Sequence, residues 1–260
     1  MLRPRLIPCL LVQNQGLVKT RRFGEPRYVG DPINAVRIFN EKVVDELMVI
    51  DIDATVKGRE PDYRMIANLA TECRMPLCYG GGVSSSAQIE HIIGLGVEKV
   101  ALSSAALARP ALIEEAAKRV GSQSVVVVLD IRKSGMLRRL EIVTHNATLQ
   151  TGIDPAAFVR EATQRGAGEI VINDVDRDGM MEGFDLELVE KLRRETSLPM
   201  TIIGGAGSLQ HVAELWSAQG IIGAAAGSLF VFKGKYRAVL INYPNATEKA
   251  ALLKQAGFIP

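Results

Sequence analysis

One aspartate in this sequence is placed as a catalytic acid or base would be. Asp130 follows four valines and a leucine in VVVVLD (125–130), so we expect it to emerge at the end of a buried strand. A carboxyl group in that position is partly removed from water, which raises its pKa and suits it to general acid–base catalysis. The alternative is a structural role, as a helix cap or as an ion-pair partner of Arg132 or Lys133.

Two glycine-rich turns indicate phosphate binding. The turns lie in CYGGGV (78–83) and IIGGAG (202–207), where glycines let backbone N–H groups approach a phosphate without a side chain in the way. Ser104 and Ser228 each follow 23 positions after the second glycine of their turn. One such turn would be explained as a tight turn alone, but two at equal spacing favour a ligand with a phosphate at each end. The residues predicted to bind it are Gly82, Ser103, Ser104, Gly205, Gly207, Gly227 and Ser228.

Further aspartates lie in the matching segments VIDIDAT (49–55) and INDVDRD (172–178). Alternate residues on a strand share one face, so some of these carboxylates point inward while others cap helices or pair with Arg177. Carboxylates at this density would also suit a divalent cation. No histidine joins them, however, and we predict neither a metal site nor a cofactor.

The elements that must position these groups alternate along the chain. Eight short apolar runs are separated mostly by 10–20 residues of helical pattern, which predicts a parallel sheet covered by helices. A length of 260 residues fits either two ordinary domains or one α/β barrel, but eight units favour a (β/α)₈ TIM barrel over an open doubly wound sheet. The runs span 6–12, 46–52, 76–79, 99–102, 124–129, 169–175, 200–203 and 221–225.

An internal repeat indicates how the barrel is built. The motifs VIDIDAT, CYGGGV and ALSSAAL match INDVDRD, IIGGAG and AAAGSLF in the same order and at nearly the same spacing. We therefore predict a single domain over 1–260, made of half-barrels at about 1–120 and 121–245 with a C-terminal helix over 246–260. In this alignment Leu11 of PCLLV is the counterpart of Asp130, so one carboxylate of a pair is missing.

Composition narrows the class of protein. Lysine and arginine total 31 against 29 acidic residues, too small a bias to predict a nucleic-acid or membrane partner. No run approaches the roughly 18 apolar residues of a membrane span, and the N-terminal stretch lacks a cleavage site, so we expect a cytoplasmic protein.

Three cysteines without zinc or redox spacing are expected to be reduced. We expect the three histidines at the surface and the basic segment 13–31 to be a mobile loop over the barrel mouth.

The order of these motifs resembles the cyclase subunit of imidazole glycerol phosphate synthase over nearly the whole chain. The resemblance is carried by PCLLV, DELMVIDIDA, YGGGV, GSQSVVVVLDIRK, RGAGEIVINDVDRDG, GGAGS and AAAGSLF. It implies a duplicated (β/α)₈ barrel that takes ammonia from a glutaminase subunit docked on its N-terminal face. That family cleaves and cyclises a bis-phosphorylated ribulosyl substrate, using aspartates on the first and fifth strands as general acid and base.

The resemblance implies a role for particular residues. Asp130 matches the fifth-strand catalytic aspartate, Lys19 matches a lysine of the first loop, and Leu11 takes the place of the first-strand aspartate. The residues on or beside the family's phosphate positions are Gly82, Ser104, Asp178, Gly205, Gly207 and Ser228. Those that match its charged ammonia gate at the barrel floor are Arg5, Glu46, Lys99 and Glu169.

Leucine at position 11 can neither donate nor accept a proton, which puts a complete cyclase site in question. We therefore consider three candidate functions. DPINAVRIFNE, MPLCYGGG and FVFKGKYRAVLINYP also resemble cyclase-like proteins of acetamidino sugar modification in surface polysaccharides. That resemblance implies a barrel that passes glutamine-derived ammonia, with a glutaminase and a separate sugar amidotransferase as partners. The second candidate is the histidine-pathway cyclase itself. A sugar-phosphate isomerase is the third, but it would want a carboxylate on each half and would leave the gate residues unexplained.

Overall fold

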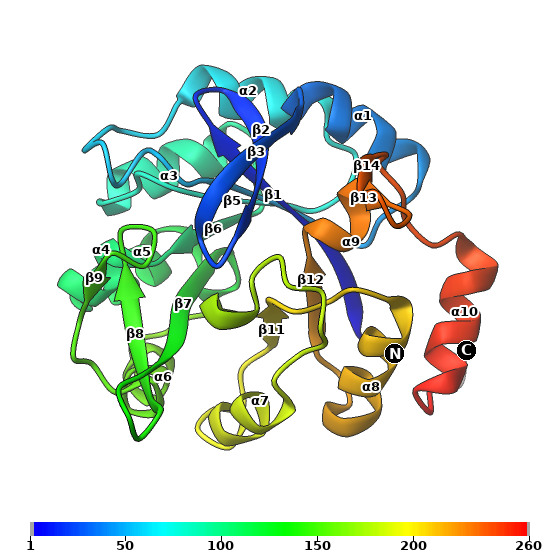
Figure 1. The fold of residues 1–260 in the computed structure, drawn as a ribbon. Coiled ribbons are helices and arrows are strands. Elements are labelled where there is room, and N and C mark those ends of the chain that lie inside the picture. The colour runs from blue at the N-terminus through cyan, green and yellow to red at the C-terminus, as the bar shows by residue number, and fades with distance from the viewer. Residues whose placement is uncertain (1–2, 259–260) are drawn as a thin grey trace.

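The chain forms a closed barrel of eight parallel strands, seen in a computed structural model that describes residues 3–258 (Figure 1). The strands follow one another around the barrel, and β7 closes it by pairing with β10. The predicted (β/α)₈ barrel is thus confirmed. In order around the barrel the strands are β1 (Arg5–Gln13), β4 (Leu47–Asp51), β5 (Leu77–Gly80), β6 (Lys99–Leu102), β7 (Val125–Ser134), β10 (Glu169–Asp174), β11 (Met200–Ile203) and β12 (Gly223–Ala226).

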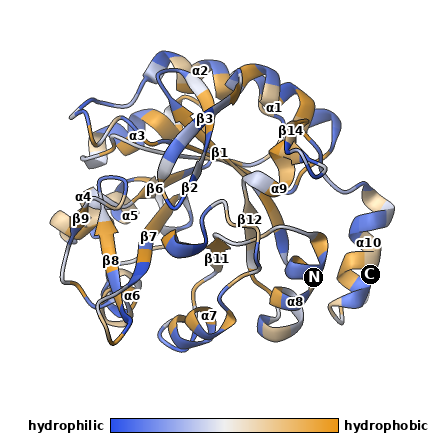
Figure 2. Cartoon of the chain, viewed as in Figure 1, coloured by the Kyte–Doolittle hydropathy of each residue, from blue (hydrophilic) through white to orange (hydrophobic). Residues whose placement is uncertain are grey.

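Amphipathic helices cover the outside of the barrel, and their buried faces pack on the strands (Figure 2). Most begin at a side-chain cap, such as Asp31, Ser85 or Asp154, whose oxygen accepts a backbone N–H. The covering helices are α1 (Pro32–Glu41), α2 (Tyr63–Glu72), α3 (Ser86–Gly94), α5 (Ala111–Val120), α6 (Pro155–Gln164), α7 (Leu186–Arg193), α8 (Leu209–Gln219) and α10 (Ala246–Gln255).

The C-terminal helix expected over 246–260 corresponds to α10, and residues 259–260 lie outside the described part of the chain, as do residues 1–2 of the expected domain. It takes the eighth covering position and packs beside α8. The Tyr243 hydroxyl donates to the Leu6 carbonyl at 2.9 Å just before this helix begins. The division into two half-barrels stays a prediction.

Three hairpins and two short helices extend the strands at the carboxyl end of the barrel. β2 (Gly16–Arg21) and β3 (Gly24–Gly30) follow β1, β8 (Arg139–Thr144) and β9 (Leu149–Gln150) follow β7, and β13 (Phe232–Lys233) and β14 (Ala238–Val239) follow β12. The short helices α4 (Ser104–Ala108) and α9 (Ser228–Val231) each begin at a serine just after a strand. Two 3₁₀ turns, η1 (Ser122–Ser124) and η2 (Val175–Arg177), complete the fold.

Strand alternation divides the core in two. One set of strand side chains packs outward against the helices, and the alternate set fills the barrel interior. Along β1 the interior set is Ile7 and Cys9, with Leu11 next toward the carboxyl end; along β7 it is Val126 and Val128, followed by Asp130. Leu11 and Asp130 therefore both come at the mouth end of an inward-facing row.

Candidate active site

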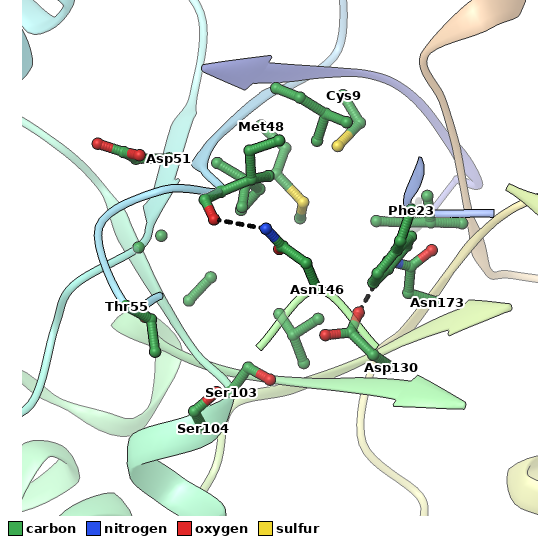
Figure 3. Close-up of a pocket in the computed structure, with 18 of the residues that line it drawn as sticks. Cys9, Phe23, Met48, Asp51, Thr55, Ser103, Ser104, Asp130, Asn146 and Asn173 are labelled. Atoms are coloured by element: carbon green, nitrogen blue, oxygen red, sulfur yellow. Dashed lines mark hydrogen bonds between the residues drawn. The ribbon is translucent and has the colours of Figure 1, made fainter. Parts of the chain in front are cut away.

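A cavity of about 530 Å³ opens at the carboxyl ends of the barrel strands (Figure 3). Its walls include the interior row of the barrel, both glycine-rich turns and the β2–β3 hairpin. In barrels of this class the loops at this end carry the chemistry. All of the residues predicted for catalysis or phosphate binding line it except Gly207, which packs against the carbonyl of Met181 close behind the second turn.

Asp130 lies in the cavity wall beside Asn173, its register partner on β10. The Asn173 side-chain amide donates to Asp130 Oδ1 at 2.8 Å (Figure 3). Burial of the side chain away from water raises the pKa of Asp130 to about 6. The hydrogen bond from Asn173 opposes this rise, and the negative charge of Asp178 adds to it. A carboxyl group with this pKa is suited to exchange a proton near neutral pH.

Leu11 presents an apolar side chain to the same cavity. It packs on the interior cluster of the barrel together with Ile50 of the neighbouring strand β4. β1 lies four strands from β7 around the barrel, so Leu11 and Asp130 come from opposite walls. The position opposite Asp130 thus carries no group that can transfer a proton.

The other mouth carboxylates are held in local structure. Asp51 Oδ1 accepts the backbone N–H groups of Asp53 and Ala54 at 2.9 and 3.1 Å, and the Asp51 side chain lies across the cavity from Asp130 in Figure 3. Burial raises the pKa of Asp51. Asp174 caps η2 and is not among the cavity residues. Neither carboxylate contacts Asp130.

The first glycine turn forms a close-packed concavity between β5 and α4. Gly82 adopts φ +72°, and a Cβ there would lie 2.7 Å from the carbonyl oxygen of Arg59. The Gly82 backbone N–H donates to Thr55 Oγ1 at 3.4 Å. Ser103 lies at the end of β6 with its hydroxyl buried and without a hydrogen-bond partner among the described residues. An unpaired buried hydroxyl beside backbone turns is a donor that an anionic ligand would satisfy.

The second glycine turn forms a matching concavity that also contains the Lys19 amino group. Gly205 adopts φ +103°, and a Cβ there would lie 2.0 Å from the Gly183 carbonyl oxygen. Lys19 reaches over Gly227, where a Cβ would be only 2.1 Å from its Nζ, and donates to the Cys9 carbonyl at 2.6 Å. Burial lowers the pKa of Lys19. The Lys19 amino group lies beside the N-terminus of α9 at Ser228, an arrangement that suits a phosphate.

The segment expected to be a mobile loop is instead an ordered hairpin, β2–β3. Asp178 holds it in place, because its carboxylate accepts the Thr20 hydroxyl at 2.6 Å and the Phe23 backbone N–H at 3.1 Å. Its backbone carbonyl also accepts the Arg22 N–H at 3.0 Å. Asp178, matched to a phosphate position in the sequence, is thus the residue that fixes the hairpin over the cavity.

Asn173, His145 and Asn146 are polar cavity residues that the sequence did not predict as part of the site. Asn173 lies within the acidic motif INDVDRD, where only the aspartates were considered as site residues. His145 was expected at the surface but lines the cavity. Asn146 reaches across the mouth and donates from Nδ2 to the Ile52 carbonyl at 3.0 Å. The only sequence signal was the alternation along β10, which puts Asn173 on the inward face with Glu169 and Val171.

The four predicted gate residues meet at the opposite end of the barrel. Arg5, Lys99 and Glu169 begin β1, β6 and β10, and Glu46 precedes β4. Lys99 Nζ contacts Glu46 Oε2 at 2.8 Å and Glu169 Oε2 at 2.9 Å, while Arg5 pairs with both glutamates. Burial alone would raise the pKa of Glu169, but the hydrogen bond and charge of Arg5, with the charge of Lys99, hold it below its usual value. Positive and negative side chains therefore alternate around this ring of four residues.

Neither a metal cluster nor a membrane segment is found within residues 3–258. Groups of three or more potential metal-ligating His, Cys, Asp or Glu side chains are absent from that range. Among the helices described there, none is long and apolar enough to cross a bilayer.

Comparison with known proteins gives consistent matches. The family model described as "Histidine biosynthesis protein" matches residues 5–237. A relative from Leptospira borgpetersenii is 55% identical over 252 residues, 97% of this chain and 99% of the relative, and one from Pseudomonas aeruginosa is 48% identical over 248 residues, 95% and 98%. Their names give them provisionally as imidazole glycerol phosphate synthase subunits HisF and hisF2. The imidazole glycerol phosphate synthase subunit HisF of Micrococcus luteus is 39% identical over 231 residues, 88% and 90% of the two chains.

Proposed function

Because the chain belongs to the histidine biosynthesis protein family and is of its HisF type, we propose that it receives ammonia from a glutaminase subunit and passes it to a sugar. The product is an acetamidino group on a sugar of a surface polysaccharide. In net balance ammonia replaces the oxygen of the acetamido carbonyl, which leaves as water. Activation of that oxygen is assigned to a separate amidotransferase.

The barrel interior supports a path for ammonia. The charged ring of Arg5, Glu46, Lys99 and Glu169 lies at the floor, and the cavity lies at the mouth. Between them the interior is lined by small and apolar side chains, namely Ile7, Cys9, Met48, Cys78, Ala101, Val126, Val128, Val171, Ile203 and Ala225. Apart from the weakly hydrogen-bonding thiols of Cys9 and Cys78, this lining offers no side-chain group to stabilise ammonium, so it favours passage of the neutral molecule. The glutaminase would dock at the floor.

The observation that carries this proposal is Leu11 in the cavity wall. Loss of one member of an acid–base pair typically costs on the order of 10²–10⁴ in rate, and catalytic groups that act as a unit fail together. Asp51 and Asp174 are held in local hydrogen bonds and do not contact Asp130. The barrel thus keeps its path and anion-binding turns but lacks the second proton-transfer group of a cyclase.

The second candidate is the histidine-pathway cyclase, and specific observations favour it. Asp130 has a pKa near 6, both glycine turns are intact, and Lys19 places its amino group at the second turn. Under this alternative the barrel itself would convert the bis-phosphorylated ribulosyl substrate to imidazole glycerol phosphate and an aminoimidazole carboxamide ribotide.

A coupled assay tests the proposal. The purified chain is mixed with its glutaminase, and glutamine hydrolysis is measured with and without the amidotransferase and its sugar, using isotope-labelled glutamine. The proposal predicts glutaminase activation by the chain and label in the acetamidino group. Label in an imidazole product, from the ribulosyl substrate at a normal cyclase rate, would favour the second candidate instead.

A further inference from the structure

Four large apolar side chains are exposed on the hairpins around the mouth, three of them on turns and one, Tyr28, along β3. Tyr28, Leu137 and Tyr236 expose 66%, 75% and 88% of their surfaces, and Met136 is fully exposed. Tyr28 lies on β3, Met136 and Leu137 on the β7–β8 turn, and Tyr236 on the β13–β14 turn. Exposed apolar side chains gathered at one end of a protein typically indicate an interaction site.

The same hairpins carry a dense group of basic side chains. The segments 21–28, 134–139 and 233–237, which we call the mouth rim, contain eight basic residues and one acidic residue, Glu25, whereas the whole chain has 31 and 29. None of the eight forms an ion pair with another described residue, and none lines the cavity. A ligand inside the cavity therefore does not account for them. They are Arg21, Arg22, Arg27, Arg138, Arg139, Lys233, Lys235 and Arg237.

The mouth rim is one connected surface. Arg27 of β3 and Arg237 of the β13–β14 turn both lie over the ring of Phe232, at 5.4 and 4.9 Å from its centroid. The loop after β10 connects the β2–β3 and β7–β8 hairpins. The Asp176 carboxylate accepts the Lys133 backbone N–H at 2.8 Å, and the Asp176 backbone carbonyl accepts a hydrogen bond from Arg22 Nε at 3.1 Å. These contacts hold Arg22, Arg27, Lys133 and Arg237 in place within the chain, so less entropy is lost when a partner binds there.

We propose that the mouth rim is the docking surface for an acidic protein with apolar contact residues, the enzyme that accepts ammonia from the barrel. This inference rests on the proposed function, which requires ammonia to leave at the mouth. Released into water, ammonia would be protonated and diluted, so an acceptor must close the opening. Apolar anchors such as Met136 and Tyr236 surrounded by unpaired arginines match the composition of protein interfaces.

Other occupants fit this surface less well. A second copy docking through the same surface would set one basic rim against another, and this like-charge contact would oppose association. Anionic lipid would be attracted to the arginines, but it would cover the cavity without offering it an acceptor enzyme. The acidic protein satisfies both the charge and the need to seal the mouth.

The test begins with photo-crosslinking in the native host. A benzophenone amino acid is placed at Met136 or Tyr236, and for comparison at Val43, which is exposed at the floor end of the barrel. The crosslinked protein is identified, purified and titrated against the wild-type chain without glutaminase. The rim variant combines Met136→Ser, Leu137→Ser, Arg138→Glu and Arg139→Glu. The control, Lys191→Glu with Lys254→Glu, makes the same change in charge on α7 and α10.

The proposal predicts that both rim positions capture one amide- or amidine-forming enzyme and that Val43 does not. The purified enzyme should bind the rim variant at least about tenfold more weakly than wild type, bind the control within about twofold, and bind more weakly as salt rises. Crosslinks to lipid, nucleic acid or a second copy, or equal binding to the rim variant, would overturn it. Glutaminase activation is measured separately, so loss of that activity in wild type would contradict the proposed function and not the docking surface.

Discussion

Leu11 and Asp130 line the same cavity from strands that lie four apart around the closed barrel. Asp130 offers a carboxyl group with a pKa near 6, whereas Leu11 offers only an aliphatic side chain. A protein that moves protons between two groups needs both, whereas a protein that conducts a neutral molecule to another enzyme does not. This asymmetry separates the two candidate functions.

Asp130 should lower stability at neutral pH. Its pKa of about 6 in the folded protein exceeds the value of about 4 in an unfolded chain, so the folded state binds more protons between those values and stability falls as pH rises from 4 to 6. We predict that Asp130→Asn raises the free energy of unfolding by about 1–3 kcal/mol at pH 8 but by little at pH 4. Denaturant unfolding at both pH values measures it; an equal effect at the two would refute the raised pKa.

The charged ring at the floor should be costly to break. Lys99→Met leaves Glu46 and Glu169, both buried, to share Arg5 alone. We predict a loss of about 2–4 kcal/mol in the free energy of unfolding, because removal of one partner strands a buried charge. Lys118→Met, which breaks an exposed pair with Glu114, is the control and should cost no more than about 0.5 kcal/mol. Similar losses in the two variants would show that the ring behaves as surface charge.

The second glycine turn should not tolerate a side chain. Gly205→Ala places a Cβ 2.0 Å from the Gly183 carbonyl oxygen in a left-handed conformation, and we predict a loss of more than about 3 kcal/mol or failure to fold. Gly135→Ala is the matched control, since Gly135 has φ +68° with open space around it and should cost about 1 kcal/mol. Thermal unfolding of both variants gives the comparison, and a mild effect at Gly205 would contradict the packing described.

The β2–β3 hairpin should open more readily without the Thr20 hydroxyl. Thr20→Val removes the 2.6 Å hydrogen bond to Asp178, which is worth about 1.5–3 kcal/mol because the acceptor is charged. We predict trypsin cleavage after Arg21 or Arg22 at least about tenfold faster than in wild type. Thr71→Val on α2, where the hydroxyl bonds only within its helix, should leave cleavage unchanged. Equal cleavage of all three proteins would mean that Asp178 does not hold the hairpin.

Much of the fold could be predicted because its signals are local. Apolar runs and helix-cap residues predicted the strands and helices, and the run 125–129 predicted that Asp130 comes just after the fully buried part of its strand. The hairpin over the mouth could not be foreseen, because Thr20 and Asp178, which fix it, are 158 residues apart. Asn146 likewise enters the cavity through a contact with Ile52 from a distant segment. Local pattern predicts which elements form, whereas long-range polar contacts decide where their loops lie.

The most direct measurement is steady-state turnover of the bis-phosphorylated ribulosyl substrate in ammonium buffer, with wild type beside Leu11→Asp. The account predicts no turnover by wild type, and any activity only in Leu11→Asp, where a carboxylate is restored opposite Asp130. Wild-type turnover at the rate of an ordinary cyclase, abolished by Asp130→Asn, would contradict it and show that another group supplies the missing proton transfer.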